Sequence, residues 1–185
     1  MAQLGFYFDM NKCTGCKCCV LSCKEKQDLE VGYNYRKVSY YEGGTFPQVW
    51  AATLSMGCNH CAMPACFAAC SVEAISKDGE TGLVEIDKEL CIGCEACVTA
   101  CPYGVPVFFP DELIAGKCDG CQDLLDQGEK PACVAGCSTR CLDFGELEDL
   151  EQQYGSVNLV KDVSGLPDSS MTDPSLLIVP KRELV

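Results

Sequence analysis

The chain has 185 residues, enough for one ordinary domain or two very small ones, with a formal net charge of -13 and 18 cysteines. Such an excess of acidic residues argues against nucleic acid or an anionic lipid surface as a partner. No apolar run approaches the roughly 20 residues of a membrane-spanning helix, and the first residues carry no secretory signal, so we expect no direct membrane insertion and no export signal of its own.

A strand is predicted at residues 4–9, LGFYFD, because this run is short and rich in aromatic side chains. It leads into the first of four cysteine runs, CTGCKCCVLSC, and a helix is expected from Cys19 to residue 30. Gaps of two, two and three residues separate four of these cysteines: Cys13, Cys16, Cys19 and Cys23. Cys18 breaks the spacing and is predicted to be a small buried side chain.

Two β-type runs follow at residues 36–41 and 48–55, and Gly43 and Gly44 between them predict a turn. Trp50, the only tryptophan, is interpreted as a core or interface residue. The second cysteine run has gaps of two, four and three residues, with a proline in the widest gap: Cys58, Cys61, Cys66 and Cys70.

Residues 72–87 predict a β-hairpin, because two β-rich arms flank Asp78-Gly79 and Gly82. The third cysteine run, CIGCEACVTACP, again has gaps of two, two and three residues and ends in a proline: Cys91, Cys94, Cys97 and Cys101. Residues 103–113 contain two prolines and are interpreted as a connector without regular structure.

The last cysteine run has a long insert between its second and third members: Cys118, Cys121, Cys133 and Cys137. The first half of the insert is helical in character, and Gly128 and Pro131 end it. Cys141 lies four residues past Cys137, so a set that ends at Cys141 is conceivable. We favour Cys137 because its gap of three residues matches the other runs.

Two segments follow the last cysteines. Residues 146–155 predict a short helix that ends at Gly155. Residues 157–185 contain three prolines and no helical period, which predicts an extended tail that lies on something larger.

Disulfides, zinc and iron–sulfur clusters could each explain so many cysteines. Disulfides impose no rule of four with fixed short gaps, and they need an oxidising compartment. Structural zinc takes two separate Cys-x2-Cys pairs, whereas the third and fourth cysteines here follow too closely for one tetrahedral ion. The spacing Cys-x2-Cys-x2-Cys-x3-Cys-Pro is the one with which bacterial ferredoxins hold cubane clusters: three cysteines wrap one cluster and the fourth reaches a second.

Crossing the fourth cysteine of each run to a partner run assigns sixteen predicted ligands to four [4Fe–4S] clusters. The middle runs give a Cys58 set and a Cys91 set: Cys58, Cys61, Cys66 with Cys101, and Cys91, Cys94, Cys97 with Cys70. The outer runs give a Cys13 set and a Cys118 set: Cys13, Cys16, Cys19 with Cys137, and Cys118, Cys121, Cys133 with Cys23. No other residue type replaces a cysteine, so three-iron centres are not expected.

His60, the only histidine, lies between two of the predicted ligands. Histidine does ligate iron in Rieske centres, but those are two-iron sites with paired histidines. We therefore predict that His60 makes a hydrogen bond to a cluster sulfur or to a backbone group instead of ligating iron.

These patterns predict an α+β protein of two interleaved bacterial-ferredoxin-like modules, each with two [4Fe–4S] clusters, together with a β-hairpin and an extended C-terminal tail. The outer module comprises residues 1–56 and 103–155, and the inner module comprises residues 57–102. The tail, residues 156–185, is expected to dock on a partner subunit. No catalytic residue is predicted.

From about Gly5 to about Arg182 the chain resembles the four-cluster iron–sulfur (beta) subunits of the dimethyl sulfoxide reductase family of molybdenum or tungsten enzymes. The resemblance rests on CTGCKCC-x3-C, CNHC-x2-PAC, CIGC-x2-C-x3-CPYGVP, KCDGC, KPAC-x3-C and LDFG. Ser71 and Ser138 stand where such subunits usually have proline. Cys141 stands where a small residue is usual, which favours a packing role for it.

The resemblance implies an electron-transfer subunit and not an enzyme. It relays single electrons between a large molybdenum or tungsten bis-pterin catalytic subunit and an external donor or acceptor, with a membrane anchor subunit or a soluble electron carrier as a further partner. Such a subunit is cytoplasmic, or is exported as a folded complex with a signal-bearing partner. The alternatives are a free-standing polyferredoxin, the relay subunit of a tungsten aldehyde oxidoreductase, and a zinc-bound interaction module.

Overall fold

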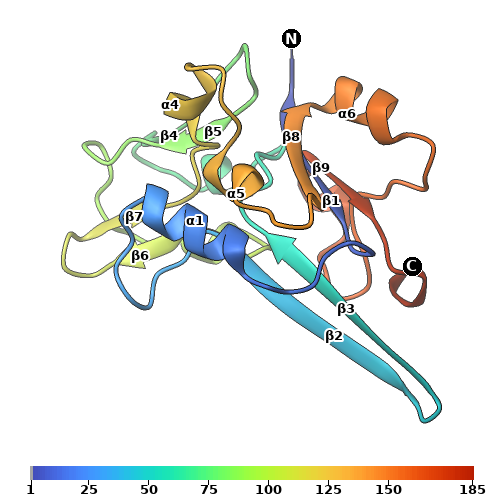
Figure 1. The fold of residues 1–185 in the computed structure, drawn as a ribbon. Coiled ribbons are helices and arrows are strands. Elements are labelled where there is room, and N and C mark those ends of the chain that lie inside the picture. The colour runs from blue at the N-terminus through green and yellow to red at the C-terminus, as the bar shows by residue number, and fades with distance from the viewer. Residues whose placement is uncertain (1) are drawn as a thin grey trace.

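The computed structural model describes residues 2–185, and its mixture of helices and strands confirms the predicted fold class at that level (Figure 1). The strands are β1 (Leu4–Asp9), β2 (Lys37–Thr45), β3 (Gln48–Met56), β4 (Ile75–Lys77), β5 (Val84–Ile86), β6 (Val107–Phe109), β7 (Ile114–Gly116), β8 (Leu142–Glu146) and β9 (Leu176–Val179). The helices are α1 (Cys18–Lys26), α2 (Ala65–Ala68), α3 (Ala96–Ala100), α4 (Gln122–Leu125), α5 (Ala132–Ala135) and α6 (Leu147–Tyr154), with 3-10 turns at Ser169–Met171 and Arg182–Leu184. None of the helices in residues 2–185 has the length and apolar character that crossing a bilayer requires.

Strand β1 is the centre of a three-stranded sheet, with β8 antiparallel on one side and β9 parallel on the other. Both faces of β1 are covered, which explains why its residues from Phe6 to Phe8 are all aromatic and do not alternate with polar residues. On one face, Tyr7 stacks on Tyr154 of α6 with ring centroids 3.7 Å apart. On the other face, Phe6 and Phe8 join the cysteine-rich core. The predicted strand at residues 4–9 and the predicted helix near residues 146–155 are confirmed.

Strands β2 and β3 form a long antiparallel arm that projects from the body of the molecule (Figure 1). The sequence predicts a turn at Gly43 and Gly44, and this prediction is wrong: both lie in β2, and the turn falls at Phe46-Pro47. Gly43 pairs with Trp50 across the arm, where an added Cβ would come within 2.7 Å of the indole ring. The glycine therefore makes room for the tryptophan side chain.

Two further hairpins lie between residues 75 and 116. The predicted hairpin at residues 72–87 is confirmed by β4 and β5, which pair antiparallel from Ile75 to Lys77. The connector predicted at residues 103–113 instead contains β6, which pairs with β7. Its two prolines flank β6 without interrupting it, a position at which proline costs no ladder hydrogen bond.

The tail, residues 156–185, lies largely on the chain's own body. Strand β9 pairs with β1, its Leu176, Leu177 and Ile178 are at most 3% exposed, and Ile178 also bridges to Val160. The run LLIV is short and continuously apolar, as is typical of a strand buried on both faces. Contact between the tail and a partner subunit stays a prediction.

Candidate metal centres

The four cysteine runs share one local design. In each run the third cysteine is the second residue of a short helix and is buried: Cys19 in α1, Cys66 in α2, Cys97 in α3 and Cys133 in α5. A residue with a left-handed backbone conformation precedes the helix in the first and third runs, whereas a proline precedes it in the second and fourth. Helix α1 packs against α5 and α2 packs against α3, so each helix pair combines one run of each kind.

A cavity with an empty volume of about 370 Å³, here the Cys58 cavity, gathers cysteines from two runs. Its cysteines are Cys58, Cys61, Cys66 and Cys101. Most of the other lining residues are apolar, and the polar ones are Asn59, Tyr103, Thr172 and Lys117. The fourth cysteine of the third run thus faces the first three of the second run.

A second cavity, here the Cys91 cavity, has a similar empty volume of about 330 Å³. Its cysteines are Cys70, Cys91, Cys94 and Cys97. Within residues 2–185, no three His, Cys, Asp or Glu side chains converge closely enough to hold a single metal ion. The thiols instead surround the two cavities, and a cubane, whose iron corners are spread apart, needs that wider arrangement. Iron ligation by these residues stays a prediction.

Backbone donors are already aimed at several thiols. The amides of Gly15, Gly120 and Ala115 donate to the sulfur atoms of Cys13, Cys118 and Cys91 at 3.5, 3.4 and 3.4 Å respectively. Such hydrogen bonds stabilise the thiolate, which is the form that ligates iron. In addition, the buried Asn59 Nδ2 has no hydrogen-bond partner among residues 2–185, although Asn59 lines the Cys58 cavity. A sulfur-rich anionic cluster fits these donors.

Burial keeps several thiols neutral when no metal is bound. It raises the pKa of Cys66 to about 12 and the pKa of Cys61 to about 11. In the outer part of the molecule burial, followed by the charges of Cys133 and Cys121, raises the pKa of Cys23 to about 12. Because iron binds thiolates, loading these sites releases protons.

The predicted outer sets lie where the ends of two runs meet. For the Cys13 set, Cys16 Sγ lies 3.5 Å from the hydroxyl of Ser138, the residue after Cys137. For the Cys118 set, burial raises the pKa of the Cys118 thiol well above its usual value, and negative charge at Cys58 and Cys23 raises it further. Cys118 therefore lies near a thiol of its own predicted set and near one of the Cys58 set.

The two cysteines outside the sets have different surroundings. The spacing predicts a buried Cys18, and this prediction is wrong: Cys18 is partly exposed at the start of α1, where the next residue, Cys19, faces the core instead. Cys141 is 3% exposed, and its Sγ lies 3.4 Å from Cys137 Sγ. A hydrogen bond from the Cys141 thiol also lowers the pKa of Cys13 to about 6.

The choice between Cys137 and Cys141 is open to a direct test. Cys137→Ala is expected to lose one cluster, about four of about sixteen irons per chain, whereas Cys141→Ala is expected to keep them all. We expect this because Cys137 keeps the gap of three residues found in the other runs, whereas Cys141 only adds a sulfur contact at 3.4 Å to Cys137. Iron analysis of anaerobically purified protein measures this, and the reverse pattern would assign the ligand role to Cys141.

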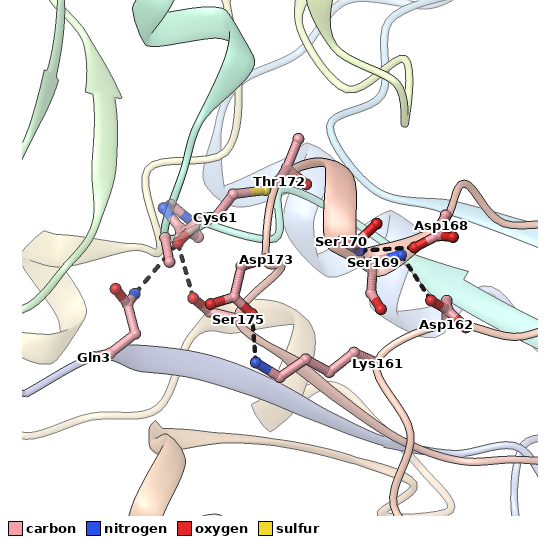
Figure 2. A network of polar contacts seen from close by, with 12 residues as sticks. Gln3, Cys61, Lys161, Asp162, Asp168, Ser169, Ser170, Thr172, Asp173 and Ser175 are labelled. Atoms are coloured by element: carbon pink, nitrogen blue, oxygen red, sulfur yellow. Dashed lines mark hydrogen bonds and ion pairs between the residues drawn. The ribbon is translucent and has the colours of Figure 1, made fainter.

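The tail holds the loop that carries Cys58 and Cys61, a contact that the sequence analysis missed (Figure 2). Ser175 Oγ and Gln3 Nε2 both donate to the carbonyl of His60, at 2.9 and 3.2 Å. The amide of Ser175 donates to the carbonyl of Asn59 at 2.9 Å, and the amide of Ala62 donates to the carbonyl of Asp173 at 2.8 Å. The loop is thus fixed on both sides of His60 by residues that are remote in sequence.

The His60 side chain is fully buried, and its Nδ1 accepts a hydrogen bond from the amide of Val84 at 3.0 Å. Burial, with the nearby charge of Lys117, lowers the pKa of His60 well below its usual value, so the imidazole is neutral and its proton lies on Nε2. The predicted hydrogen bond to a backbone group is confirmed.

Comparison with known proteins gives consistent matches. A 4Fe-4S dicluster domain model matches residues 49–147, and a 4Fe-4S binding domain model matches residues 10–33. The B subunit of anaerobic dimethyl sulfoxide reductase from Haemophilus influenzae is 39% identical over 191 residues, which cover 98% of this chain and 91% of that protein. The protein of the same name from Escherichia coli is 40% identical, with 96% and 89% covered. Protein NrfC of Escherichia coli is 33% identical, with 96% and 81% covered.

Proposed function

This chain is a member of the family of iron–sulfur subunits that includes the B subunit of anaerobic dimethyl sulfoxide reductase, and on this basis we propose that it relays single electrons through four [4Fe–4S] clusters. As a member of that family it is an electron-transfer subunit of a reductase complex, with [4Fe–4S] clusters as its cofactors. The relay runs between a large catalytic subunit with a molybdenum or tungsten bis-pterin centre and an external donor or acceptor. A membrane anchor subunit or a soluble carrier occupies the far end.

The observation that carries the proposal is the composition of the two cavities. Each is lined by three cysteines of one run and the fourth cysteine of another, and the two have similar volumes. Sequence spacing alone assigns the same eight cysteines to the Cys58 set and the Cys91 set. The outer runs repeat this local design, which supports the Cys13 set and the Cys118 set as the other two sites.

We further propose that the chain is built from two interleaved modules. Residues 1–56 and 103–155 form the outer module, whose helices α1 and α5 pack together, and residues 57–102 form the inner module, whose helices α2 and α3 do the same. The two modules come close at Lys117, whose Nζ lies 3.5 Å from Cys58 Sγ and donates to the carbonyl of Cys118 at 2.9 Å. That proximity favours electron transfer between them.

In this proposal the clusters supply one-electron redox chemistry, and the chain's own residues hold and shield them. The cysteines ligate iron, the amides of Gly15, Gly120 and Ala115 stabilise thiolates, and apolar side chains such as Val84 and Val105 exclude water from the Cys58 cavity. No step in substrate chemistry is assigned to this chain. Substrate binding belongs to the catalytic subunit.

The test is anaerobic purification of the tagged chain together with the proteins that bind it. We expect brown protein with about sixteen irons and sixteen sulfides per chain, bound to a large pterin-containing subunit. Colourless, iron-free protein would overturn the proposal, and about eight irons would restrict the clusters to the inner module. A fully loaded chain that stays active alone would favour the free-standing polyferredoxin.

A further inference from the structure

Two cations are buried in this iron–sulfur protein without carboxylate partners. Arg36 is 2% exposed and Lys117 is 6% exposed, and they are the buried arginine and lysine side chains of residues 2–185. Within the same residues neither forms an ion pair with an aspartate or a glutamate. A buried cation is costly unless an anion compensates it, so the compensating charge must come from another group.

The guanidinium of Arg36 lies among thiols of the outer module. Its Nη1 donates to the carbonyl and the hydroxyl of Ser55, at 3.3 and 3.2 Å, and the same hydroxyl lies 3.3 Å from Cys19 Sγ. The Cζ atom of the guanidinium lies 4.5 Å from the centre of the Phe6 ring. Its Nη2 is buried without a hydrogen-bond partner among the described residues.

The cysteines whose charge acts most strongly on Arg36 belong mainly to one predicted set. Burial lowers the pKa of Arg36, but the negative charge that the surrounding cysteines carry as thiolates raises it by more: Cys133, Cys118, Cys19 and Cys23. Three of these four belong to the Cys118 set, and Cys19 belongs to the Cys13 set. Gly57 maintains the space for this side chain, because an added Cβ there would come within 3.1 Å of Nη2.

Lys117 lies beside a predicted cluster site of the inner module. It lines the Cys58 cavity, and its Nζ lies 3.5 Å from Cys58 Sγ. The ammonium group is held in place by the carbonyls of Val84 and Cys118, the latter at 2.9 Å. Lys117 therefore lies where the two modules meet, in contact with Cys58 of the inner module and Cys118 of the outer module, and Arg36 lies beside Gly57, the residue before Cys58.

We propose that the buried charges of Arg36 and Lys117 raise the reduction potentials of two clusters. Lys117 acts on the cluster held by the Cys58 set, and Arg36 acts on the cluster held by the Cys118 set. This inference rests on the proposed function. A [4Fe–4S] cluster with four thiolates gains one negative charge when it accepts one electron from its neighbour, from roughly −2 to −3. A fixed cation in a low-dielectric site favours the more negative state, so the electron rests preferentially at the junction between the modules.

The experiment compares Arg36→Gln and Lys117→Gln in the complete complex by redox titration monitored by electron paramagnetic resonance. Each variant is expected to shift one cluster to a lower potential, and the two variants are expected to shift different clusters. Cluster identity comes from the signals that disappear in Cys101→Ala, for the Cys58 set, and in Cys23→Ala, for the Cys118 set. Arg36→Lys, which keeps the charge, is expected to shift its cluster much less than Arg36→Gln.

The exposed Lys88 is the matched control, because Lys88→Gln removes the same charge where solvent screens it. The inference is overturned if Arg36→Gln and Lys117→Gln keep about sixteen irons and shift the cluster potentials no further than Lys88→Gln does. That result leaves the proposed function intact. Iron-free wild-type protein overturns the proposed function itself. If Arg36→Gln loses its cluster, Lys117→Gln decides: an unshifted Cys58-set cluster overturns the inference, and a lowered one supports it.

Discussion

Replacing Cys101 with alanine is expected to remove one complete cluster and to lower the iron content from about sixteen to about twelve per chain. The reason is that Cys101 faces Cys58, Cys61 and Cys66 across one cavity, although it belongs to a different run. A cubane with only three thiolates has one iron without a protein ligand, and we expect the incomplete site to lose the whole cluster and not only that iron. Iron and sulfide analysis after anaerobic purification measures the loss.

Double variants identify which cysteines share a cluster. Cys58→Ala combined with Cys101→Ala is expected to lose no more iron than either alone, because both act on one site. Cys91→Ala combined with Cys101→Ala is expected to lose about eight irons, because two sites are affected. Cys18→Ala serves as the control and is expected to keep all of the iron. The opposite result for the two double variants would show that each run holds its own cluster.

Replacing Ile178 with alanine is expected to destabilise the whole protein by about 2–5 kcal/mol, the usual cost of truncating a buried isoleucine. Ile178 is fully buried in β9, pairs with Phe8 of β1 and bridges to Val160. For a chain of this length the midpoint of thermal unfolding should fall by roughly 2–4 °C per kcal/mol, in total on the order of 10 °C. Loss of the cluster absorbance during anaerobic heating at a fixed rate measures it.

Met171 provides the control for this prediction, because it lies in the same tail but is 60% exposed. Met171→Ala is expected to change the midpoint by no more than about 2 °C. If Ile178→Ala behaved like this control in the isolated chain, the tail would not be an integral part of the fold. A loss that appeared only in the complex would then assign β9 to the interface with the partner.

Local patterns in the sequence predict much of this fold. Strand β1, the hairpin of β4 and β5, and helix α6 are found where they are predicted, because aromatic runs, Asp-Gly turns and a C-terminal glycine act over a few residues. The cysteine spacing likewise names two groups of four that the structure gathers around cavities. The geometry of a cluster constrains the spacing of its cysteine ligands, so the ligands can be grouped from the sequence without knowledge of the fold.

The remaining features depend on contacts between distant residues. Gly43 and Gly44 read as a turn because nothing local reveals that Trp50 lies across from Gly43. The tail is predicted only as an extended segment lying on something larger, because residues 157–185 contain three prolines and no helical period. Its partner, β1, lies at the other end of the sequence. The buried cations Arg36 and Lys117 carry no sequence signal at all, since their isolation from carboxylates appears only in the folded chain.

The central place of β1 has a consequence for how the protein is made. Its two neighbours in the sheet follow only at residues 142 and 176, so β1 leaves the ribosome without either of them. At about 5–20 residues per second, the nascent strand waits on the order of 10–30 s for β9. The Cys91 cavity is lined only by residues up to Ala115, whereas the Cys58 cavity also needs Thr172 and the loop support from the tail. Biosynthesis therefore lets the Cys91 site form before the terminal sheet closes, and the Cys58 site is completed only together with that sheet.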